Sequence, residues 1–311
     1  MGVMTTSAAA VDVSVMVCTR NRCDALARLL GRLEQLAVPA GVRWELIVVD
    51  NGSTDGTAAL LGAYCGALPL RVVREPTRGL SRARNAGLAV ATGDILLLTD
   101  DDCLPDAQWL ATVRDEFARA PELDVLGGRV ELYDERDQPT TTRTSRERET
   151  IRMAFNLDGI IGCNLAFRRS VLGVSGPFDV ALGGGTGAGA GEDVDFVYRA
   201  LRAGLRAEYS PDVLVYHNHG RRTAAEVLAL RRVYTVARGA LFCKYLMARD
   251  PAILTRIKHD TIFHVRATVD DLRGLRFPRR VFRHYYHLGV GAAYWLRHRL
   301  TDRDAADNMG G

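Results

Sequence analysis

The chain is predicted to be an α/β protein with a doubly wound sheet that carries helices on both faces. Three apolar runs of strand length support this prediction, over 13–18, 45–50 and 95–98, and none alternates regularly between apolar and polar residues. Such runs are typical of strands covered on both faces, as in a parallel sheet. Segments with helical periodicity lie between them, and strands that alternate with helices form βαβ units.

Local patterns define the elements of the first third of the chain. Asp24 is a candidate N-cap for a helix whose apolar positions follow a 3.6-residue period, namely Leu26, Leu29, Leu30, Leu33 and Leu36. A polar turn over 51–56 is expected to open a second helix. A short strand over 70–74 and a helix over 79–91 should then lead into the strand that begins at Ile95.

The stretch 94–105, DILLLTDDDCLP, combines a buried strand with three carboxylates. Asp100, Asp101 and Asp102 follow the apolar run, and open α/β sheets bind ligands at the carboxyl ends of their strands. Adjacent carboxylates repel one another unless a cation lies among them. Oxygen ligands suit Mg²⁺ or Mn²⁺, which also bind phosphate oxygens. A metal site is the preferred interpretation, and a solvated acidic turn that caps the next helix is the alternative.

Composition limits the classes of function. The chain has 311 residues, is 47% hydrophobic and 25% charged, and carries a net charge of only +4, which does not indicate a nucleic-acid partner. Its six cysteines form no CxxC pair or zinc spacing, so a reducing cytoplasm is expected. We predict no signal peptide and no spanning helix, because no run approaches the roughly 20 apolar residues that a span needs.

Six motifs, in this order, resemble those of the family 2 glycosyltransferases, whose fold is called GT-A. They are VCTRNR (17–22), VVDNGSTDGT (48–57), GLSRARNAGL (79–88), LLLTDDDCLP (96–105), GCNLAFRR (162–169) and GEDVDF (191–196). Each motif alone is weak, but six in register are specific. The resemblance covers roughly residues 13 to 220, and it implies a mixed sheet of the GT-A type and an inverting, metal-dependent sugar transfer.

The resemblance implies a site for a nucleoside-diphosphate sugar, with a UDP-sugar as the expected donor. The residues that it places at the nucleotide sugar are Thr19, Arg20, Asp50, Ser53, Arg84, Asp100 and Asp101. It implies that Mg²⁺ or Mn²⁺ is held by Asp100 and Asp102 with His217. Asp50 could instead cap the turn after its strand, and His217 could be an ordinary loop histidine. Relatives often carry an aromatic residue in place of Arg20; a guanidinium also stacks on a base, so the base stays open.

A glycine-rich stretch over 183–191 precedes Glu192 and Asp193, which open a helix ending near Gly204. By resemblance this acidic pair supplies the general base, and we assign that role to Asp193, with Glu192 beside it. A carboxylate in a site closed to water has the access and raised pKa that proton removal needs. Helix capping is the alternative for the pair, and the glycines could form either a loop that orders over substrate or a plain linker.

The second half of the domain continues with strands expected over 125–132, 160–167 and 213–216. The polar segment 134–152 is predicted to be a mobile insertion or the start of an exposed helix. Thr223 and Glu226 form a capping box for a helix whose stripe is expected to pack in the core: Val227, Leu230, Tyr234, Ala237 and Leu241.

Four regions are therefore expected: a flexible tail (1–12), a nucleotide-sugar half (13–132), an acceptor half (133–220) and a basic helical extension (221–311). The extension mixes Arg and His with aromatic residues between 276 and 299. This composition suits peripheral contact with a membrane surface, at the inner face, or a homo-oligomer contact.

The function predicted is an inverting glycosyltransferase that acts on an acceptor hydroxyl. A GT-A-like nucleotidyltransferase is less favoured, because CTRNRCDAL (18–26) lacks the glycine-rich basic loop of such enzymes. A non-catalytic sugar-nucleotide or glycan-binding module would not need the acidic motifs. The acceptor stays open among glycans, lipid-linked molecules, peptides and small metabolites.

Overall fold

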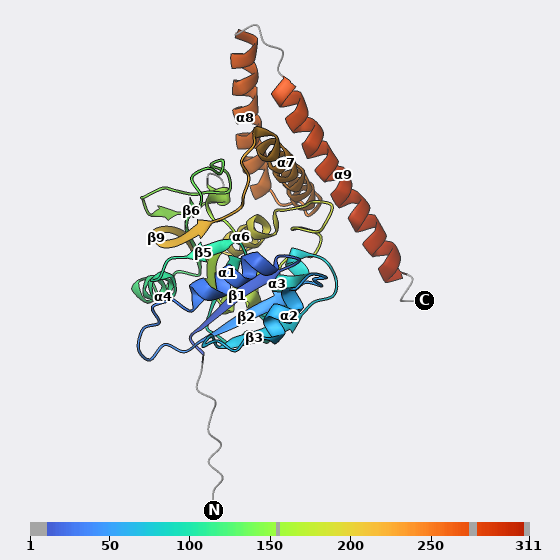
Figure 1. Cartoon of the computed structure of the whole chain (residues 1–311). Helices are drawn as coiled ribbons and strands as arrows, with labels where there is room; N and C mark the ends of the chain where they lie inside the picture. The colour runs from blue at the N-terminus through green and yellow to red at the C-terminus, as the bar shows by residue number, and fades with distance from the viewer. Residues whose placement is uncertain (1–10, 154–155, 274–278, 308–311) are drawn as a thin grey trace, which may run out of the picture.

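The computed structural model describes residues 11–153, 156–273 and 279–307. One mixed sheet forms the body of the protein, and long helices leave it toward the C-terminus (Figure 1). Most of the predicted tail, residues 1–12, lies outside the described residues. The strand order is β3-β2-β1-β4-β8-β6-β9-β5, and β7 pairs with β9.

The N-terminal half of the sheet is parallel. Its strands are β1 (Val13–Thr19), β2 (Trp44–Asp50), β3 (Leu70–Arg74) and β4 (Ile95–Asp100). In the register, Thr19 lies opposite Asp50, and Cys18 lies opposite Asp100. The polar residues at the carboxyl ends of β1, β2 and β4 therefore meet at one edge, as predicted from the strand positions.

The C-terminal half of the sheet is mixed. Its strands are β5 (Cys103–Pro105), β6 (Val125–Leu132), β7 (Glu149–Thr150), β8 (Asn164–Arg168) and β9 (Ala207–His217). β8 runs antiparallel to β4 and β6, while β9 runs parallel to β6. The pairing of β5 with β9 sets Cys103 opposite His217, which brings the last aspartate of the acidic motif to this histidine.

Helices cover both faces of the sheet. They are α1 (Cys23–Leu33), α2 (Thr57–Gly62), α3 (Leu80–Val90), α4 (Trp109–Arg119), the 3₁₀ turn η1 (Leu157–Gly159), α5 (Ser170–Ser175) and α6 (Glu192–Arg202). One core cluster contains apolar residues of α1 and α4, and another contains those of α3 and α6. The predicted leucine stripe of α1 is buried. Asp24 does not cap this helix, because the N–H of Cys23 donates to Asp55 Oδ2 at 3.1 Å.

The predicted helical extension is confirmed. It consists of α7 (Ala224–Met247), α8 (Ala252–Arg273) and α9 (Arg279–Asp307), and the capping box of Thr223 and Glu226 forms as expected. α7 and α9 pack closely, since a Cβ on Gly239 would overlap the Leu288 carbonyl and one on Gly291 would overlap the Val236 carbonyl. Within the described parts of the chain, no helix has the length and apolarity to cross a membrane.

The polar segment 134–152 differs from the helix that we considered for it. It begins with turns and irregular chain, forms β7 against β9, and contains Arg143, which bridges to Val130. The glycine-rich stretch is not a plain linker either. Four of its glycines, including Gly183 and Gly191, have positive φ, and the Gly184 carbonyl accepts from the N–H of Leu80 at 2.8 Å, which ties the stretch to α3.

Candidate active site

A cavity of about 670 Å³ opens at the carboxyl edge of the parallel strands. The predicted site residues that line it come from β1, α3, β4, α6 and β9: Thr19, Arg20, Arg84, Asp100, Asp101, Asp102, Glu192, Asp193 and His217. Asp50 and Ser53 are not among its lining residues. Their neighbour Asn51 is, and it enters from the same turn.

The turn after β2 is held by a network that explains the position of Asp50. The carboxylate of Asp50 accepts the N–H of Ser53 at 2.8 Å, and both side chains are buried. The Asn51 side chain crosses to the next loop, where its Oδ1 accepts from the N–H of Gly79 at 2.9 Å. Arg20 Nη1 donates to the carbonyls of Asn51 and Gly52, at 2.5 and 2.9 Å. Asp50 therefore shapes the turn from behind the cavity surface.

The three aspartates of the acidic motif do not share the same set of contacts. Asp101 accepts from Thr19 Oγ1 at 2.8 Å and pairs with Arg22 Nη1 at 3.1 Å, and burial raises its pKa to about 6. Asp102 pairs with the same guanidinium nitrogen at 2.5 Å. All three aspartates line the cavity, but only Asp101 is also held by a hydrogen bond from the end of β1.

Asp102 and His217 form a close pair. Asp102 Oδ1 lies 3.3 Å from His217 Nε2. Burial alone would raise the pKa of Asp102, but the hydrogen bond with His217 and the charge of Arg22 lower it below its usual range. For His217, the bond to Asp102 outweighs burial and raises the pKa to about 9. Asp102 and His217, two of the three predicted metal ligands, are thus brought together from positions more than a hundred residues apart.

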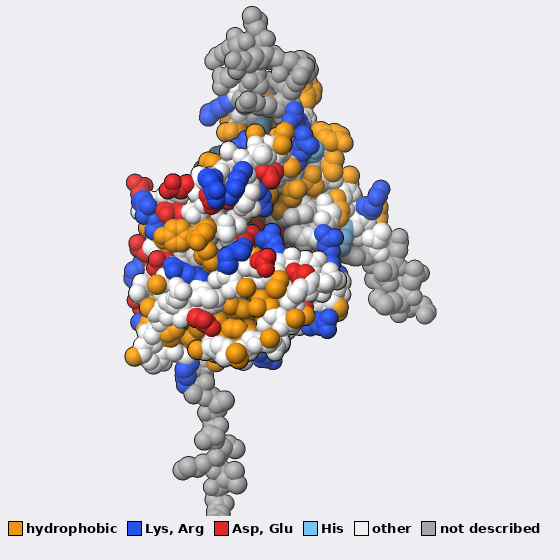
Figure 2. All heavy atoms as spheres, viewed as in Figure 1, with side chains coloured by type: hydrophobic (Ala, Val, Ile, Leu, Met, Phe, Trp, Pro, Cys, Tyr) orange, Lys and Arg blue, Asp and Glu red, His pale blue; other side chains and the backbone are white. Residues whose placement is uncertain are grey.

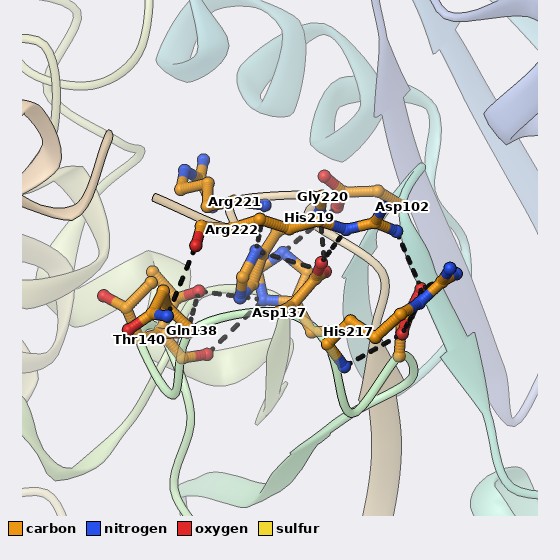
Figure 3. Close-up of polar contacts among 12 residues, drawn as sticks. Asp102, Asp137, Gln138, Thr140, His217, His219, Gly220, Arg221 and Arg222 are labelled. Atoms are coloured by element: carbon orange, nitrogen blue, oxygen red, sulfur yellow. Dashed lines mark hydrogen bonds and ion pairs between the residues drawn. The ribbon is translucent and has the colours of Figure 1, made fainter. Parts of the chain in front are cut away.

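The polar segment 134–152 fixes the loop that carries His217 (Figure 3). The buried carboxylate of Asp137 accepts from the N–H of Gly220 at 2.8 Å and from Arg222 Nε at 3.2 Å, and lies 3.5 Å from His219 Nδ1. On the other side, the Thr141 hydroxyl lies 3.1 Å from His217 Nδ1. Since outer partners of this kind orient metal ligands, the segment supports the site and is more than a solvated loop.

Across the cavity, Arg84 joins the acidic motif to the first turn of α6. Its guanidinium lies 2.8 Å from Glu192 Oε1 and 3.5 Å from Asp100 Oδ1, and the side chain is buried. Burial, and then the charge of Asp193, raise the pKa of Glu192 to about 7, against the opposing charge of Arg84. The two acidic residues of α6 thus have different surroundings, and Glu192 is the one committed to an ion pair.

Asp193 faces the cavity beside a glycine. Asp193 Oδ2 accepts the N–H of Gly162 at 2.8 Å, and Oδ1 accepts that of Val194 at the same distance. A Cβ on Gly162 would come within 2.9 Å of Asp193 Oδ2 and 3.0 Å of Arg84 Nη2. The glycine of the GCN motif therefore makes room for both side chains, and Asp193 keeps lone pairs that could take a proton from a bound hydroxyl.

The geometry agrees with a family comparison. A family model described as glycosyl transferase family 2 matches residues 14–175, just over half of the chain. The chain belongs to this family. The predicted membership and the GT-A fold are confirmed, and the prediction of a glycosyltransferase holds at the level of the family.

Curated relatives share this assignment at low identity. A Pre-mycofactocin glycosyltransferase of Mycobacterium tuberculosis is 28% identical over 219 residues, which cover 67% of this chain but 43% of the relative. The glycosyltransferase AglE of Haloferax volcanii is 29% identical, over 66% of each protein. The succinoglycan biosynthesis protein ExoM of Rhizobium meliloti is 27% identical, over 73% of this chain and 80% of its own length. The chain thus spans less than half the length of the first relative.

Solved structures support the fold. The mannosyltransferase PcManGT from Pyrobaculum calidifontis, in complex with GDP-Man and Mn²⁺, matches with a TM-score of 0.61 at 22% identity, over 91% of this chain and 86% of that one. TarS of S. aureus in complex with UDP-GlcNAc matches with a TM-score of 0.55 at 21% identity, over 73% and 66%. At these identities the likeness shows the GT-A fold.

The residues of this family member fit a divalent cation. Asp100 and Asp102 supply carboxylate oxygens and His217 an imidazole nitrogen, a ligand set that suits Mn²⁺ or Mg²⁺, and all three line the cavity. The buried thiols of Cys103 and Cys163 lie within 4.8 Å of a ring nitrogen of His217. Softer ions that prefer thiolates would therefore compete for the same histidine.

Several cavity residues were not predicted. Arg22 lies in the VCTRNR motif, and its role depends on contacts with Asp101 and Asp102, which are distant in sequence. Arg221 also lines the cavity, and within the described residues its Nη1 is buried with no hydrogen-bond partner. Leu230 and Tyr234 of α7 line the cavity too, so the predicted core stripe is wrong for the first half of α7. Only its second half is covered, with Ala237 and Leu241 buried.

Proposed function

We propose that the protein is an inverting, divalent-metal-dependent glycosyltransferase that moves a sugar from a nucleoside-diphosphate sugar to an acceptor hydroxyl. The observation that carries this proposal is that one cavity joins Asp193 to the set Asp100, Asp102 and His217. The first is a carboxylate available as a base, and the second is a ligand set for a cation that binds diphosphate. No binding module needs both.

The chemical step needs one base and no enzyme nucleophile. Asp193 takes the proton of the acceptor hydroxyl as its oxygen attacks the anomeric carbon from the face opposite the diphosphate. The bond from that carbon to the diphosphate oxygen breaks, and its electron pair leaves with the nucleoside diphosphate. The configuration at the anomeric carbon is inverted. Glu192 positions α6 through its bond to Arg84 and does not receive the proton.

Charge on the leaving diphosphate is balanced from two sides. A divalent cation held by Asp100, Asp102 and His217 would supply positive charge at the diphosphate oxygens. Arg221 adds a guanidinium whose Nη1 has no partner within the described residues and which lines the same cavity. Such a donor, already desolvated, stabilises an anion more strongly than an exposed one does.

We assign the donor as a UDP-sugar, held in the region of Thr19, Arg20, Asp50 and Ser53. Asp50 acts on the nucleobase indirectly, through the turn that it shapes. TarS was solved with UDP-GlcNAc and PcManGT with GDP-Man, so the fold accommodates both bases. Arg20 Nη1 donates to the Asn51 and Gly52 carbonyls, and a guanidinium held beside this turn can stack on a nucleobase.

The test is a turnover assay with UDP- and GDP-sugars in Mn²⁺, with release of nucleoside diphosphate as the signal. We expect release with a UDP-sugar, loss of release in excess EDTA, and a product with the opposite anomeric configuration. Release of pyrophosphate from a nucleoside triphosphate and a sugar phosphate would identify a nucleotidyltransferase instead. Nucleotide binding without any turnover, for a broad set of acceptors, would identify a binding module.

A further inference from the structure

One part of the cavity lining, which we call the apolar wall, is made of hydrophobic side chains. It is formed by α7 and by the segment before β8, with these residues: Leu157, Ile160, Ile161, Leu230, Val233, Ala237, Leu241 and Phe242. Tyr234 adds an aromatic ring to the same wall, and Asp193 lies among these lining residues. The proposed base therefore stands between a charged wall and an apolar wall.

The first half of α7 leaves apolar side chains uncovered at the cavity. Val233 is 37% exposed and Tyr234 is 41% exposed although both line the cavity. Leu230, Val233, Tyr234 and Ala237 follow the i, i+3, i+4, i+7 spacing of one helix face. Apolar surface left in water is unfavourable by about 25 cal/mol per Å², so a bound apolar group would be favoured along this face.

The charged groups on this wall are already paired. Arg238 Nη2 lies 3.6 Å from Asp158 Oδ2, Arg256 forms an ion pair with the same carboxylate oxygen, and Arg238 Nη1 also pairs with Asp260 at 2.8 Å. A sugar chain would need hydrogen-bond donors and acceptors that are free to bind its hydroxyls. Aliphatic carbon and paired guanidinium groups fit an apolar chain better.

The same helices continue the apolar surface outside the cavity. On α9, Phe282 and Tyr286 are 63% and 69% exposed, and on α8 Phe263 is 69% exposed. Exposed arginines, such as Arg283 and Arg297, lie beside them on α9. Figure 2 shows hydrophobic side chains gathered over α7 and α9, with Lys and Arg side chains around them. Apolar and basic side chains together suit the surface of an anionic membrane.

We propose that the acceptor is lipid-linked. Its hydroxyl lies at Asp193, and the start of its apolar chain lies along the α7 face from Leu230 to Ala237. The acceptor is presented from a membrane surface that α8 and α9 contact. This inference rests on the proposed glycosyl transfer and specifies its acceptor. The glycine contacts between α7 and α9 hold the cavity wall and the exposed α9 face in one unit, so a chain from the membrane reaches the base without a rearrangement of helices.

The first test measures chain-length dependence without any donor. Butyl, hexyl and octyl β-glucosides, kept below their micelle concentrations, are titrated into the full-length protein by calorimetry. Burial of one methylene is worth about 0.8 kcal/mol, a factor of about four, so we expect octyl glucoside to bind roughly tenfold or more tighter than butyl glucoside. An affinity that does not change from butyl to octyl overturns the proposal, and a gain that stops at hexyl also overturns it, because that result assigns the wall to a short aglycone.

A matched pair of variants locates the chain. Val233 and Leu228 lie on the same helix and are each 37% exposed, but only Val233 lines the cavity. Val233→Ser should remove most of the gain from butyl to octyl, whereas Leu228→Ser should keep it. Equal effects of the two substitutions would overturn the placement along α7.

The membrane part is tested with vesicles of anionic phospholipid. The full-length protein should cosediment with them in a salt-sensitive manner, and the double variant Phe282→Ser, Tyr286→Ser should lose most of this binding. Failure of the wild-type protein to cosediment would overturn presentation from a membrane. Thermal stabilisation by UDP with Mn²⁺ separates this proposal from the previous one: if UDP stabilises the protein while the glucoside series is flat, only the acceptor assignment fails.

Discussion

One wall of the cavity, which we call the donor wall, is built from charged side chains paired with one another, whereas the wall that includes α7 is built from apolar side chains, some of them buried and some left partly exposed. On the donor wall, Arg22 lies between Asp101 and Asp102, and Arg84 between Asp100 and Glu192. On the apolar wall, Val233 and Tyr234 remain more than a third exposed. The donor wall is preorganised for a polar ligand, and the apolar wall is the one to which we assign an apolar ligand.

The difference follows the limits of the family match. The family model ends at residue 175, before α6 and α7 begin. The residues assigned to nucleotide and metal fall mostly within the matched part, whereas α7, which supplies most of the apolar wall, falls outside it. Motifs that handle the shared donor are therefore recognisable across relatives, while the acceptor must be inferred from the surface of this particular chain.

The largest effect is expected from breaking the donor wall at its metal ligands. Asp102→Ala removes a carboxylate from the predicted metal site and leaves His217 without its partner, so turnover should fall below detection and nucleoside diphosphate should bind more weakly. Excess EDTA should do the same to the wild type. Initial rates and nucleotide titrations measure both effects, with the circular dichroism spectrum as the control for folding. Full activity in EDTA would contradict the metal assignment.

The next largest effect, on kcat, is expected from substitution of the proposed base Asp193. Asp193→Asn cannot accept the acceptor proton, so kcat should fall by roughly 10² to 10⁴ while donor affinity stays near that of the wild type. Glu192→Gln should lower kcat less, because Glu192 only positions α6. A variant at Asp193 that kept its kcat, or that lost donor affinity, would show that this residue is not the base.

A smaller effect is expected behind the donor wall. Asp137→Asn weakens the contacts that fix the loop after His217, and it does not change a predicted metal ligand. Loss of an outer partner typically lowers metal affinity or activity by about 10- to 100-fold. A Mn²⁺ titration of the rate should therefore show a higher half-saturating concentration. Asp134→Asn, on the same segment but partnered with Arg136 and Arg222, is the control and should change this concentration little.

The smallest effect is on stability and depends on pH. Glu192 has a folded pKa of about 7 against an ordinary 4.5, raised by burial and by Asp193 and Asp100, and opposed by Arg84. Because the folded state binds this proton more tightly, its stabilising contribution is complete below about pH 4.5 and is lost as the pH rises through 7. Thermal melts should show Glu192→Gln gaining on the wild type between pH 5 and 8. A constant difference in Tm would contradict the raised pKa.

Most of the donor wall could be predicted from the sequence. The carboxyl ends of parallel strands share one edge, so Thr19 and Asp100 could be placed together from their strands alone. Asp193, which the sequence predicted as a site residue from the GEDVDF motif, also lines this cavity. The loop at Asp50 was harder, because its side chain bonds within its own turn and does not reach the cavity surface.

Other parts depend on contacts that no local pattern reveals. The role of Asp137 depends on Gly220, Arg222 and His219, which lie more than eighty residues later. The apolar stripe of α7 identified a helix face correctly, but periodicity does not say whether a neighbouring element covers that face. Here the second half is buried and the first half is left partly exposed, and side chains of both halves line the cavity.

Arg84 contacts residues on both sides of the proposed site, the donor side and the acceptor side. Its guanidinium contacts Asp100 on the donor side and Glu192 at the start of the helix that carries the base. A diphosphate that binds near Asp100 changes the electrostatic balance at Arg84, and with it the balance at Glu192. Linkage between two binding equilibria is reciprocal, so the factor by which donor alters acceptor affinity equals the factor by which acceptor alters donor affinity. The sign of that cooperativity determines whether each substrate strengthens or weakens the binding of the other.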